Sequence, residues 1–309
     1  MSVDLKNRSV LVTGGGGFIG SHLIAALTAR GAQVHTVLRP GSTAPRLEAL
    51  GLAPQVHFLD VTDTEAVRRL AFGLQPQIVF NLAVSRSDDS PDLLEQTNVA
   101  AAQSLLAGCN FSGFRRFVTI GSGLERFAPA GDARATPYAI SRHRAAERLR
   151  AQAAGQGVAL AHLRTFYVYG PLQAPNRLIP AALHCLQTGE HLPLATSQAR
   201  RDYVHVRDVV RACIAAAQSD KPGYTVADIA TGQAWSAEEV VRMLEQIACR
   251  SIQTQSDKTI ARAWDATHEN IDITPARQLL GWEPSVCLAD GLRELLTETL
   301  HSEAVAHAV

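Results

Sequence analysis

The sequence has no excess of charge of either sign and very little lysine. Its 29 lysine and arginine residues balance 29 aspartate and glutamate residues, which gives a formal net charge of zero at pH 7. A nucleic-acid partner therefore has no electrostatic support, because such partners are usually met by a basic surface. Only three of the cations are lysines, so any role that needs a buried or catalytic cation falls mainly to arginine.

Long apolar runs and paired cysteines are also missing. No stretch of about 18 apolar residues is present, so no membrane-spanning helix is expected. The first 20 residues have no cationic segment leading into an apolar one, so we expect no signal peptide and a cytoplasmic location. The histidines show no metal-ligand spacing, and we expect no metal. The five cysteines include no CxxC pair and are expected to be reduced thiols: Cys109, Cys185, Cys213, Cys249 and Cys287.

What the chain does have is a regular alternation of strand-like and helical segments over its first 165 residues or so. This pattern predicts an α/β fold, a doubly wound parallel sheet of the Rossmann type. The strand-like segments are 8–13, 33–38, 55–60, 77–84, 114–122 and 157–166. The helical segments between them are 18–30, 63–72, 91–109 and 137–154.

The second half of the sequence is less regular. We expect residues 1–170 to form a dinucleotide-binding domain and 171–309 to form mainly a smaller, mixed α/β substrate-binding part. The two are expected to interleave, with a strand near 224–230 returning to the main sheet. Further helices are predicted at 178–188, 207–217, 236–248, 275–280 and 287–300.

A glycine-rich loop follows the first strand. It reads Thr13-Gly-Gly-Gly-Gly-Phe-Ile-Gly20, with the spacing Gly-x-x-Gly-x-x-Gly, and a helical segment begins at once. Glycine permits the tight turn and lets backbone amides approach a pyrophosphate at the positive end of the helix. Between a strand and a helix, this loop predicts dinucleotide binding. The expected cofactor contacts here are Gly14, Gly17, Phe18, Ile19 and Gly20.

The end of the second strand carries no acid. NAD sites usually place Asp or Glu there to bind the ribose 2′-hydroxyl, whereas this chain has Leu38-Arg39, with Arg46 nearby. An arginine suits a 2′-phosphate, so we favour NADP(H), with NAD(H) as the alternative if Arg39 is only a surface residue. Asp60 and Val61 end the third strand and are expected to meet the adenine.

Three polar residues suggest catalysis at the carboxyl edge of the sheet. Ser122 ends the fifth strand, and Tyr138 and Arg142 stand four residues apart on one face of the next helix. A phenol with an ordinary pKa near 10 is a weak acid–base at neutral pH, and a nearby cation lowers that pKa by stabilising the phenolate.

Several motifs in order make the sequence resemble the extended short-chain dehydrogenases/reductases, specifically the NAD(P)-dependent epimerase/dehydratase family acting on nucleotide sugars. They are TGGGGFIG (13–20), NLAV (81–84), TNVAA (97–101), YAISR (138–142), LRTFYVYGP (163–171), RRDYVHVRDVV (200–210) and LLGWEP (279–284). The resemblance implies cofactor contacts at Leu82 and Ala83, within the NLAV element, and at Tyr138 and Arg142. It also implies a Ser/Thr-Tyr-Lys catalytic set, which Ser122 and Tyr138 match.

Arg142 stands where the family has lysine, a residue that binds the nicotinamide ribose and tunes the tyrosine. Arginine keeps the charge, but its planar head is longer and not equivalent. Three interpretations stay open: a tolerated exchange, a retuned or slowed enzyme, and a cofactor-binding pseudoenzyme.

The resemblance places substrate contacts in the second half. Asn176, Arg177 and Arg201 are expected at the nucleotide diphosphate, and Tyr169, with Tyr167 as an alternative, at the sugar. Arg201 could instead pair with Asp202 or Asp208. Asp208 is expected to be structural, and Trp282 is expected to pack in the core. A homodimer through the helices at 91–109 and 137–154 is also expected, because both carry apolar stripes.

The reaction is less constrained. Dehydratases of the family usually carry an Asp-Glu pair directly after the catalytic Ser or Thr, but here the first acid after Ser122 is Glu125. Epimerases usually keep the strand-two acid that is missing here. We therefore favour an NADPH-dependent 4-keto-sugar-nucleotide reductase. The alternatives are a nucleotide-sugar epimerase with tightly bound NAD, a dehydratase, a reductase of another carbonyl, and a non-catalytic dinucleotide sensor.

Overall fold

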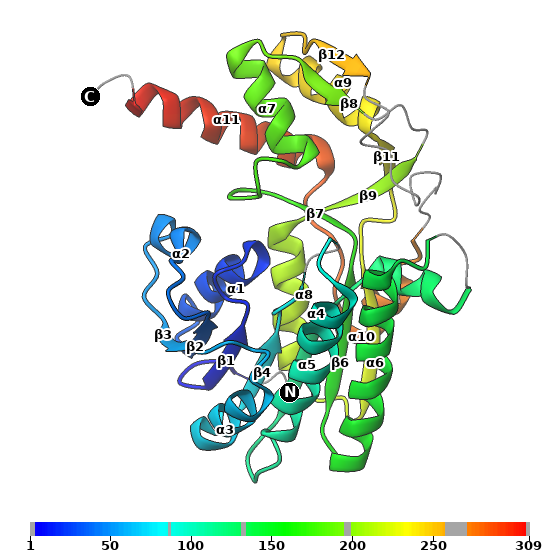
Figure 1. The fold of residues 1–309 in the computed structure, drawn as a ribbon. Helices are drawn as coiled ribbons and strands as arrows, with labels where there is room; N and C mark the ends of the chain where they lie inside the picture. Colours follow the sequence, from blue (N-terminus) through cyan, green and yellow to red (C-terminus); the bar gives the residue numbers. More distant parts are fainter. Residues whose placement is uncertain (1–3, 86–87, 131–133, 195–198, 257–270, 307–309) are drawn as a thin grey trace. The chain divides into compact units, whose positions relative to one another are not determined.

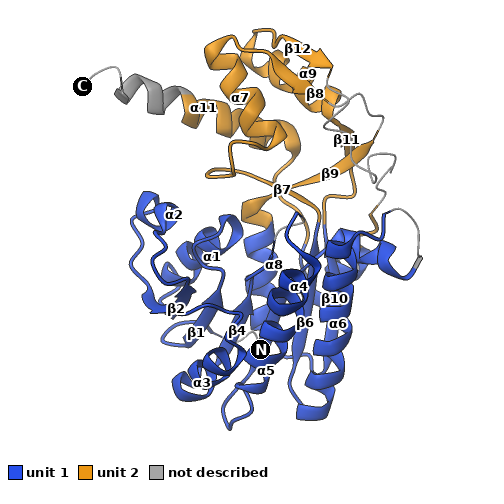
Figure 2. Ribbon diagram, viewed as in Figure 1, with its two compact units in different colours: residues 1–165, 209–229, 274–282 blue, residues 166–208, 230–273, 283–309 orange. Residues whose placement is uncertain are grey.

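The computed structural model of the chain describes residues 4–85, 88–130, 134–194, 199–256 and 271–306. The chain divides into two units (Figure 2). Unit 1 holds residues 1–165, 209–229 and 274–282, and unit 2 holds residues 166–208, 230–273 and 283–309. The first crossing, after residue 165, lies close to the expected boundary at 170, and two later segments rejoin unit 1.

Unit 1 is built on a seven-stranded sheet in the order β10-β6-β5-β4-β1-β2-β3, in which all neighbours are parallel (Figure 1). The predicted doubly wound parallel sheet is confirmed. The strand expected near 224–230 is β10, which lies at one edge of the sheet beside β6. The strands are β1 (Ser9–Thr13), β2 (Gln33–Leu38), β3 (Gln55–Phe58), β4 (Ile78–Asn81), β5 (Arg116–Ser122), β6 (Leu160–Thr165) and β10 (Tyr224–Ile229).

Helices cover both faces of this sheet. On one face α3, α5 and α6 bury a core that includes Leu11, Val79, Leu105, Phe117 and Leu149, and α1 and α8 lie on the opposite face (Figure 1). Their bounds are α1 (Phe18–Thr28), α2 (Pro45–Ala49), α3 (Thr64–Leu74), α4 (Pro91–Leu94), α5 (Ala101–Ala107), α6 (Pro137–Gln156), α8 (Val206–Gln218) and α10 (Thr274–Leu280). The first residues of α8, up to Asp208, belong to unit 2.

The continuous helix expected over 91–109 is interrupted. Between α4 and α5 the chain forms the π-helix η1 (Glu95–Ala100), whose residues Thr97, Asn98 and Val99 are buried. A π-turn inserts an extra residue per turn and often marks a functional position. After β5 comes a 3₁₀ segment, η2 (Gly123–Ala130), which the sequence pattern did not indicate.

Unit 2 contains two small sheets and three helices among its described residues. One sheet has the order β11-β9-β7 and the other pairs β12 with β8. The strands are β7 (Tyr167–Tyr169), β8 (Leu192–Leu194), β9 (Arg200–His205), β11 (Ala234–Ser236) and β12 (Thr254–Ser256). The helices α7 (Leu178–Thr188), α9 (Ala237–Ala248) and α11 (Leu288–Ala306) enclose an apolar core. A capping box of Ser236 and Glu239 fixes the start of α9.

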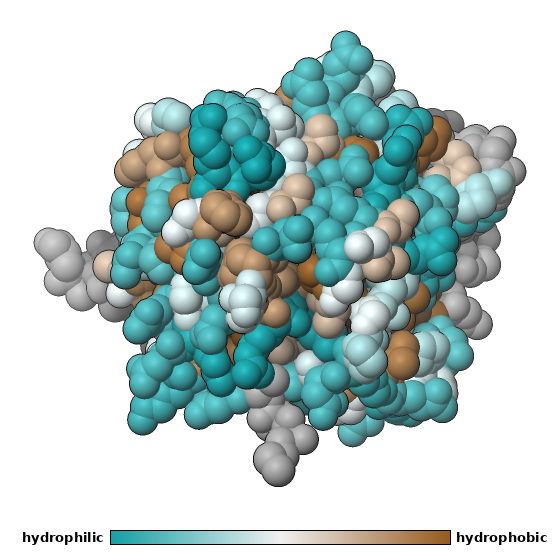
Figure 3. All heavy atoms as spheres, turned by 90° about the horizontal axis from the view of Figure 1, so that it is seen from below, coloured by the Kyte–Doolittle hydropathy of each residue, from teal (hydrophilic) through white to brown (hydrophobic). Residues whose placement is uncertain are grey.

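Large apolar side chains are exposed singly rather than in one broad area. Figure 3 shows one face of the molecule, on which hydrophobic patches are small and lie between hydrophilic side chains. Val56, Phe58 and Phe72 of unit 1 are among the exposed ones. No described helix is both long and apolar enough to cross a membrane. The described residues also contain no group of three or more His, Cys, Asp or Glu side chains placed to hold a metal.

Candidate active site

The glycine loop is packed too closely for side chains. Gly14 has a φ of +71°, and a β-carbon there would lie 2.7 Å from the backbone of Leu82 and Ala83 at the end of β4. A β-carbon at Gly20 would lie 2.2 Å from the carbonyl oxygen of Gly14. The loop therefore has to be glycine, because it presses against β4 on one side and carries the start of α1 on the other.

The same loop fits the pyrophosphate of a dinucleotide. Helix α1 has 11 residues, and its N-cap, Gly17, is exposed and supplies no side-chain cap. The first amides of a helix have no acceptor within it, so this end presents uncapped donors with a positive dipole. Phe18 and Ile19 are half-buried at this start. Thr13 steadies the base of the loop, because its hydroxyl donates to Asn81 (2.9 Å) and accepts from the amide of Ala83 (3.3 Å).

The end of β2 carries an exposed Arg39 that faces an acid. The pKa of Asp60 is lowered mainly by hydrogen bonds from the amide and hydroxyl of Thr62, and the charge of Arg39 adds to this. Asp60 is exposed, whereas Val61 packs into the core of unit 1 and is 9% exposed. Of the two residues expected at the adenine, Asp60 thus has its side chain at the surface. The side chain of Val61 is buried, so Val61 could contact a ligand mainly through its backbone.

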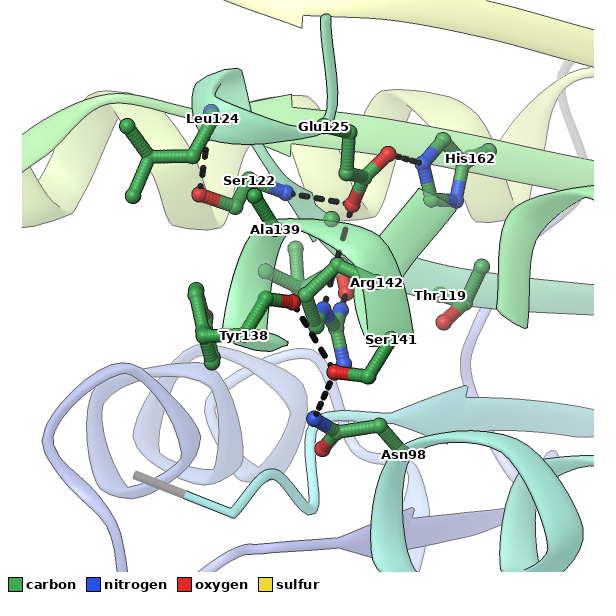
Figure 4. A network of polar contacts seen from close by, with 12 residues as sticks. Asn98, Thr119, Ser122, Leu124, Glu125, Tyr138, Ala139, Ser141, Arg142 and His162 are labelled. Atoms are coloured by element: carbon green, nitrogen blue, oxygen red, sulfur yellow. Dashed lines mark hydrogen bonds and ion pairs between the residues drawn. The ribbon is translucent and has the colours of Figure 1, made fainter. Parts of the chain in front are cut away.

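Ser122 and Tyr138 come to the carboxyl end of the sheet from strand β5 and helix α6. Ser122 is the last residue of β5, and its hydroxyl accepts a hydrogen bond from the amide of Leu124 (3.3 Å). Helix α6 begins with Thr136, which accepts from the amide of Ala139 (3.2 Å), and with Pro137 in its first turn. This cap sets Tyr138, half-buried, in the first turn (Figure 4).

Next to Ser122 lies a buried group of three ionisable side chains, Glu125, Arg142 and His162 (Figure 4). The carboxylate of Glu125 accepts from the amide of Ser122 (2.7 Å) and from Nε2 of His162 (2.7 Å). The Nε of Arg142 is 3.8 Å from Oε1, the carboxylate oxygen that also accepts from the amide of Ser122. Burial alone would raise the pKa of Glu125, but His162, Arg142 and the amide of Ser122 together lower it. Glu125 is therefore ionised at neutral pH.

Arg142 is buried beside this carboxylate. Its side chain is 6% exposed, and its Nη2 donates to the carbonyl oxygen of Ile120 in β5. The expectation was a guanidinium that reaches the nicotinamide ribose. The buried carboxylate of Glu125 is a second group that attracts this cation.

Asn98 is a site residue that the sequence reasoning missed. Its side chain accepts from the amide of Ser85 (2.9 Å) and donates to the hydroxyl of Ser141 (2.9 Å). That hydroxyl in turn donates to the carbonyl of Tyr138 (2.9 Å). The π-helix η1 presents Asn98 to the first turn of α6. The available signal was an asparagine inside the TNVAA motif, on an otherwise apolar helix face.

In unit 2, Arg201 lies with its guanidinium 4.6 Å from the ring centroid of Tyr167. The carboxylates considered as its partners are held by other groups. Asp202 accepts from Thr231 and Gly232, and Asp208 accepts from residues 285 and 286. Asp208 fastens that segment to the start of α8, which agrees with the structural role expected for it.

The other expected substrate contacts divide into surface and core. Asn176 and Arg177 are exposed, in the loop that enters α7. Tyr169 is 1% exposed and belongs to the core of unit 2, where a β-carbon on Gly291 would lie 2.1 Å from its hydroxyl. The structure therefore corrects the expectation that Tyr169 lines a sugar pocket, because its ring is enclosed by protein. Trp282 is also buried, as expected for packing.

The sequence profile of the NAD dependent epimerase/dehydratase family matches residues 10–230, which is more than half of the chain. The chain belongs to this family. It is accordingly an enzyme of the extended short-chain dehydrogenase/reductase class.

Relatives and solved structures agree with this membership over most of the chain. The UDP-glucose 4-epimerase of Mycolicibacterium smegmatis is 28% identical and covers 91% of this chain and 95% of its own. The dTDP-glucose 4,6-dehydratase of Streptomyces griseus is 29% identical, and the match covers 92% of this chain and 91% of the dehydratase. The crystal structure of UDP-glucose 4-epimerase from Thermotoga maritima, with UDP-glucose, is 27% identical, with a TM-score of 0.83 and coverage of 96% and 99%. MoeE5 in complex with UDP-glucuronic acid and NAD is 29% identical, with a TM-score of 0.80 and coverage of 95% and 99%.

As a member of the epimerase/dehydratase family, the chain departs from the expected catalytic set at position 142. Arginine replaces the family lysine at position 142, and this arginine is paired with a buried acid, Glu125. A β-carbon at Gly121 would lie 2.5 Å from His162 and 2.7 Å from Glu125, so the glycine before Ser122 leaves the room that this pair needs.

Proposed function

We propose that the chain is a nucleotide-sugar 4-epimerase that works with NAD. The observation that carries the proposal is the placement of Ser122 and Tyr138 at the carboxyl edge of the sheet that also carries the glycine loop. Ligands of doubly wound sheets bind at that edge. The names of the relatives support epimerisation over the reduction that the sequence alone favoured.

The proposal assigns the proton chemistry to two side chains. Tyr138, as phenolate, removes the proton from the sugar C4 hydroxyl and returns it when the inverted alcohol forms. Ser122 donates a hydrogen bond to the same oxygen. When bound, the nicotinamide ring supplies reversible uptake of the C4 hydride. The glycine loop at 14–17 binds the pyrophosphate through its amides and those of α1.

Dehydration is disfavoured by the position of Glu125. A dehydratase needs a carboxyl group that can donate a proton to the leaving hydroxyl. Glu125, the first acid after Ser122, has a 3% exposed side chain and is occupied by Arg142 and His162. Its pKa is lowered, so it holds no proton to give at neutral pH.

In unit 2 we propose that Arg201, Arg177 and Asn176 bind the nucleotide diphosphate. Arg201 lies over the ring of Tyr167, which orients its planar fork for two oxygens of a diphosphate. The prediction is that Arg201→Ala raises the KM for the nucleotide sugar about tenfold and changes kcat less, since a charge-assisted hydrogen bond contributes roughly 1.5–3 kcal/mol.

A second candidate, an NADPH-dependent 4-keto-sugar-nucleotide reductase, rests on the end of β2. Leu38 and Arg39 stand where NAD sites carry an acid, and Arg39 is exposed. Under this candidate Arg39→Ala weakens NADPH about tenfold or more and leaves NADH unchanged. Arg39 also faces Asp60, which already offsets part of its charge, and this favours NAD as the resident cofactor.

The homodimer stays a prediction. The apolar residues of α5 and α6, such as Leu105 and Leu149, lie in the core of unit 1. The outer face of α6 carries Arg144, which pairs with Glu95 at 2.8 Å, and the exposed Arg148. A dimer through these helices would therefore use charged and small residues. Sedimentation that shows only monomer at micromolar concentration would contradict it.

The test of the proposed function compares turnover with and without added nucleotide. Purified protein is incubated with UDP-glucose alone, and UDP-galactose is measured by chromatography. The expected result is interconversion without added cofactor, with NAD released on denaturation. Stoichiometric oxidation of NADPH with 4-keto sugar nucleotides would favour the reductase instead.

Two matched variants show whether the chemistry lies where proposed. Tyr138→Phe should abolish turnover while the protein still binds NADH. Tyr169→Phe removes the same atom from the core of unit 2, where the hydroxyl has no hydrogen-bond partner, and should leave kcat/KM unchanged. Loss of activity in both variants would contradict the assignment of the two tyrosines.

A further inference from the structure

The buried group next to Ser122 joins three elements that are far apart in the sequence. Glu125 lies in η2, Arg142 in α6 and His162 in β6, and all three side chains are 6% exposed or less (Figure 4). The Oε1 atom of Glu125 accepts from the backbone of Ser122 and faces Arg142, while Oε2 accepts from His162. One carboxylate therefore touches the backbone of one proposed reacting residue and the cation on the helix of the other.

The groups that face this carboxylate can be named from each packed element. Helix α6 contributes Arg142, and β6 contributes His162, whose Nε2 donates because a carboxylate can only accept. Strand β10 contributes Tyr224, whose ring is stacked on His162 with centroids 6.5 Å apart. The pKa of Tyr224 is raised to about 12 by burial and by the charges of Glu125 and Glu147. Tyr224 therefore stays neutral where Glu125 and Arg142 are both charged.

Arg142 is held away from solvent by the same contacts. Its Nη2 is bound to the carbonyl oxygen of Ile120 and its Nε faces Glu125, so its head is fixed from two sides. Arg142 and Tyr138 stand four residues apart on α6, which places both side chains on one face of the helix. The guanidinium is thus a charge held inside the protein on the side of α6 that carries Tyr138.

We propose that Glu125 and Arg142 are positioning residues that act as an opposed pair of fixed charges on Tyr138, with Glu125 offsetting the guanidinium and holding the backbone of Ser122, and that neither contacts the cofactor. This inference rests on the proposed function for its catalytic meaning, but not for its measurement. It replaces the expected lysine-like role of Arg142, in which one cation both tunes the phenol and binds the ribose.

The proposal predicts shifts of opposite sign from the two halves of the pair. Loss of the carboxylate in Glu125→Gln leaves the guanidinium unopposed, so the phenolate is favoured and the pKa of Tyr138 falls. Loss of the cation in Arg142→Met leaves the carboxylate unopposed, so the pKa of Tyr138 rises. For the loss of one neighbouring charge in a partly buried site we expect a shift of about half to one pH unit. Glutamine keeps an acceptor for Ser122, so loss of hydrogen bonding does not explain the first shift.

The experiment is a tyrosinate titration by absorbance at 295 nm, which needs no substrate. The chain has five tyrosines, so each protein is compared with its own Tyr138→Phe counterpart and the difference reports Tyr138 alone. The expected results are a lower pKa in Glu125→Gln, a higher pKa in Arg142→Met, and a value near wild type in Arg142→Lys. If Arg142→Met fails to fold, the double variant Glu125→Gln/Arg142→Met removes both charges and should return the pKa of Tyr138 to within about 0.3 units of wild type.

Two further readouts separate this inference from the proposed function. NADH affinity, followed by fluorescence, should change less than about threefold in Arg142→Met and Glu125→Gln, since neither side chain contacts the cofactor. Shifts of the same sign, shifts below about 0.2 units in both single variants, or a tenfold loss of NADH affinity would overturn the inference. If the shifts are opposite and no sugar nucleotide is turned over, the proposed function fails and the inference stands.

Discussion

Glu125 in unit 1 and Asp202 in unit 2 are both removed from water, yet their surroundings treat the charge in opposite ways. Glu125 faces a cation, Arg142, and a histidine, and its pKa is lowered in spite of burial. The pKa of Asp202 is raised by burial, even though its carboxylate accepts from the backbone and hydroxyl of Thr231 and from the amide of Gly232. At Asp202 the neutral donors do not outweigh the effect of burial on the pKa, whereas at Glu125 the contacts with His162, Arg142 and the amide of Ser122 do.

The difference matches what each carboxylate holds together. Asp202 ties β9 to the residues that follow β10, within unit 2, and its task is complete once the donors are satisfied. Glu125 instead leaves two charges side by side at the end of the sheet where Ser122 and Tyr138 lie. We therefore expect substitutions of Asp202 to affect stability alone and substitutions of Glu125 to affect both stability and the titration of Tyr138.

The largest expected effect comes from breaking the charged pair on one side. Glu125→Ala leaves the guanidinium of Arg142 buried without its partner, and such a loss costs about 3–5 kcal/mol in the free energy of unfolding. Urea unfolding followed by circular dichroism measures it. The double variant Glu125→Ala/Arg142→Met should recover most of the loss, because no uncompensated charge remains. A double variant as unstable as the single one would show that packing, not charge, dominates.

Asp202→Ala should cost less, about 2–3 kcal/mol, because it leaves neutral donors rather than a charge without a partner. Asp202→Asn keeps one acceptor oxygen and should cost about half as much. Both are measured by the same urea unfolding, with the Tyr138 titration as the second readout. A shift of that titration in Asp202→Asn would contradict the separation between the two carboxylates.

The opposite pKa directions predict opposite dependences on pH. Because the pKa of Glu125 is lowered on folding, its contribution is present above its ordinary value of 4.5 and is lost as the pH falls below it. Because the pKa of Asp202 is raised, its ionised form opposes folding, and stability is gained as the pH falls toward the ordinary value of 3.8. Between pH 7 and pH 4, the destabilisation caused by Glu125→Gln should shrink and that caused by Asp202→Asn should grow. Changes of the same sign in both variants would contradict the assignment.

The sequence predicted the sheet well because each strand carries its own local signal. The segment 33–38 is β2 without a change of bounds, and the strand near 224–230 is β10. Both are apolar runs bounded by turn residues, and the glycine loop was equally readable, since its spacing reflects close packing at fixed positions.

The direction of Arg142 could not be predicted in this way. The spacing of four residues places it on the same helix face as Tyr138, but a long side chain turns toward whatever charge is nearest. That charge is Glu125, which sits in a 3₁₀ segment without a sequence pattern and which also contacts His162, from a strand 20 residues further on. Tyr169 was misplaced for a related reason: a strand exit was recognised, but nothing local says that unit 2 encloses it.

The smallest expected effect on stability comes from a pair of histidines, His35 and His57. It shows how burial acts on a titratable side chain whose neighbour is another histidine rather than an opposite charge. His35 lies on β2 and His57 on the neighbouring strand β3, with Nδ1 of His35 and Nε2 of His57 3.1 Å apart. Burial lowers the pKa of His35, and His57 lowers it further, so the neutral ring is favoured in the folded chain. Stability is therefore complete above the ordinary value of 6.5 and falls as the pH drops below it.

Between pH 7.5 and pH 5.5 we expect the Tm to fall by about 1–3 °C more in the wild type than in His35→Gln, which has no ring to protonate. His191→Gln, at an exposed position, is the matched control and should keep the wild-type dependence. An equal fall in wild type and His35→Gln would show that the pair contributes nothing to acid sensitivity and that charge neighbours such as those of Glu125 decide it alone.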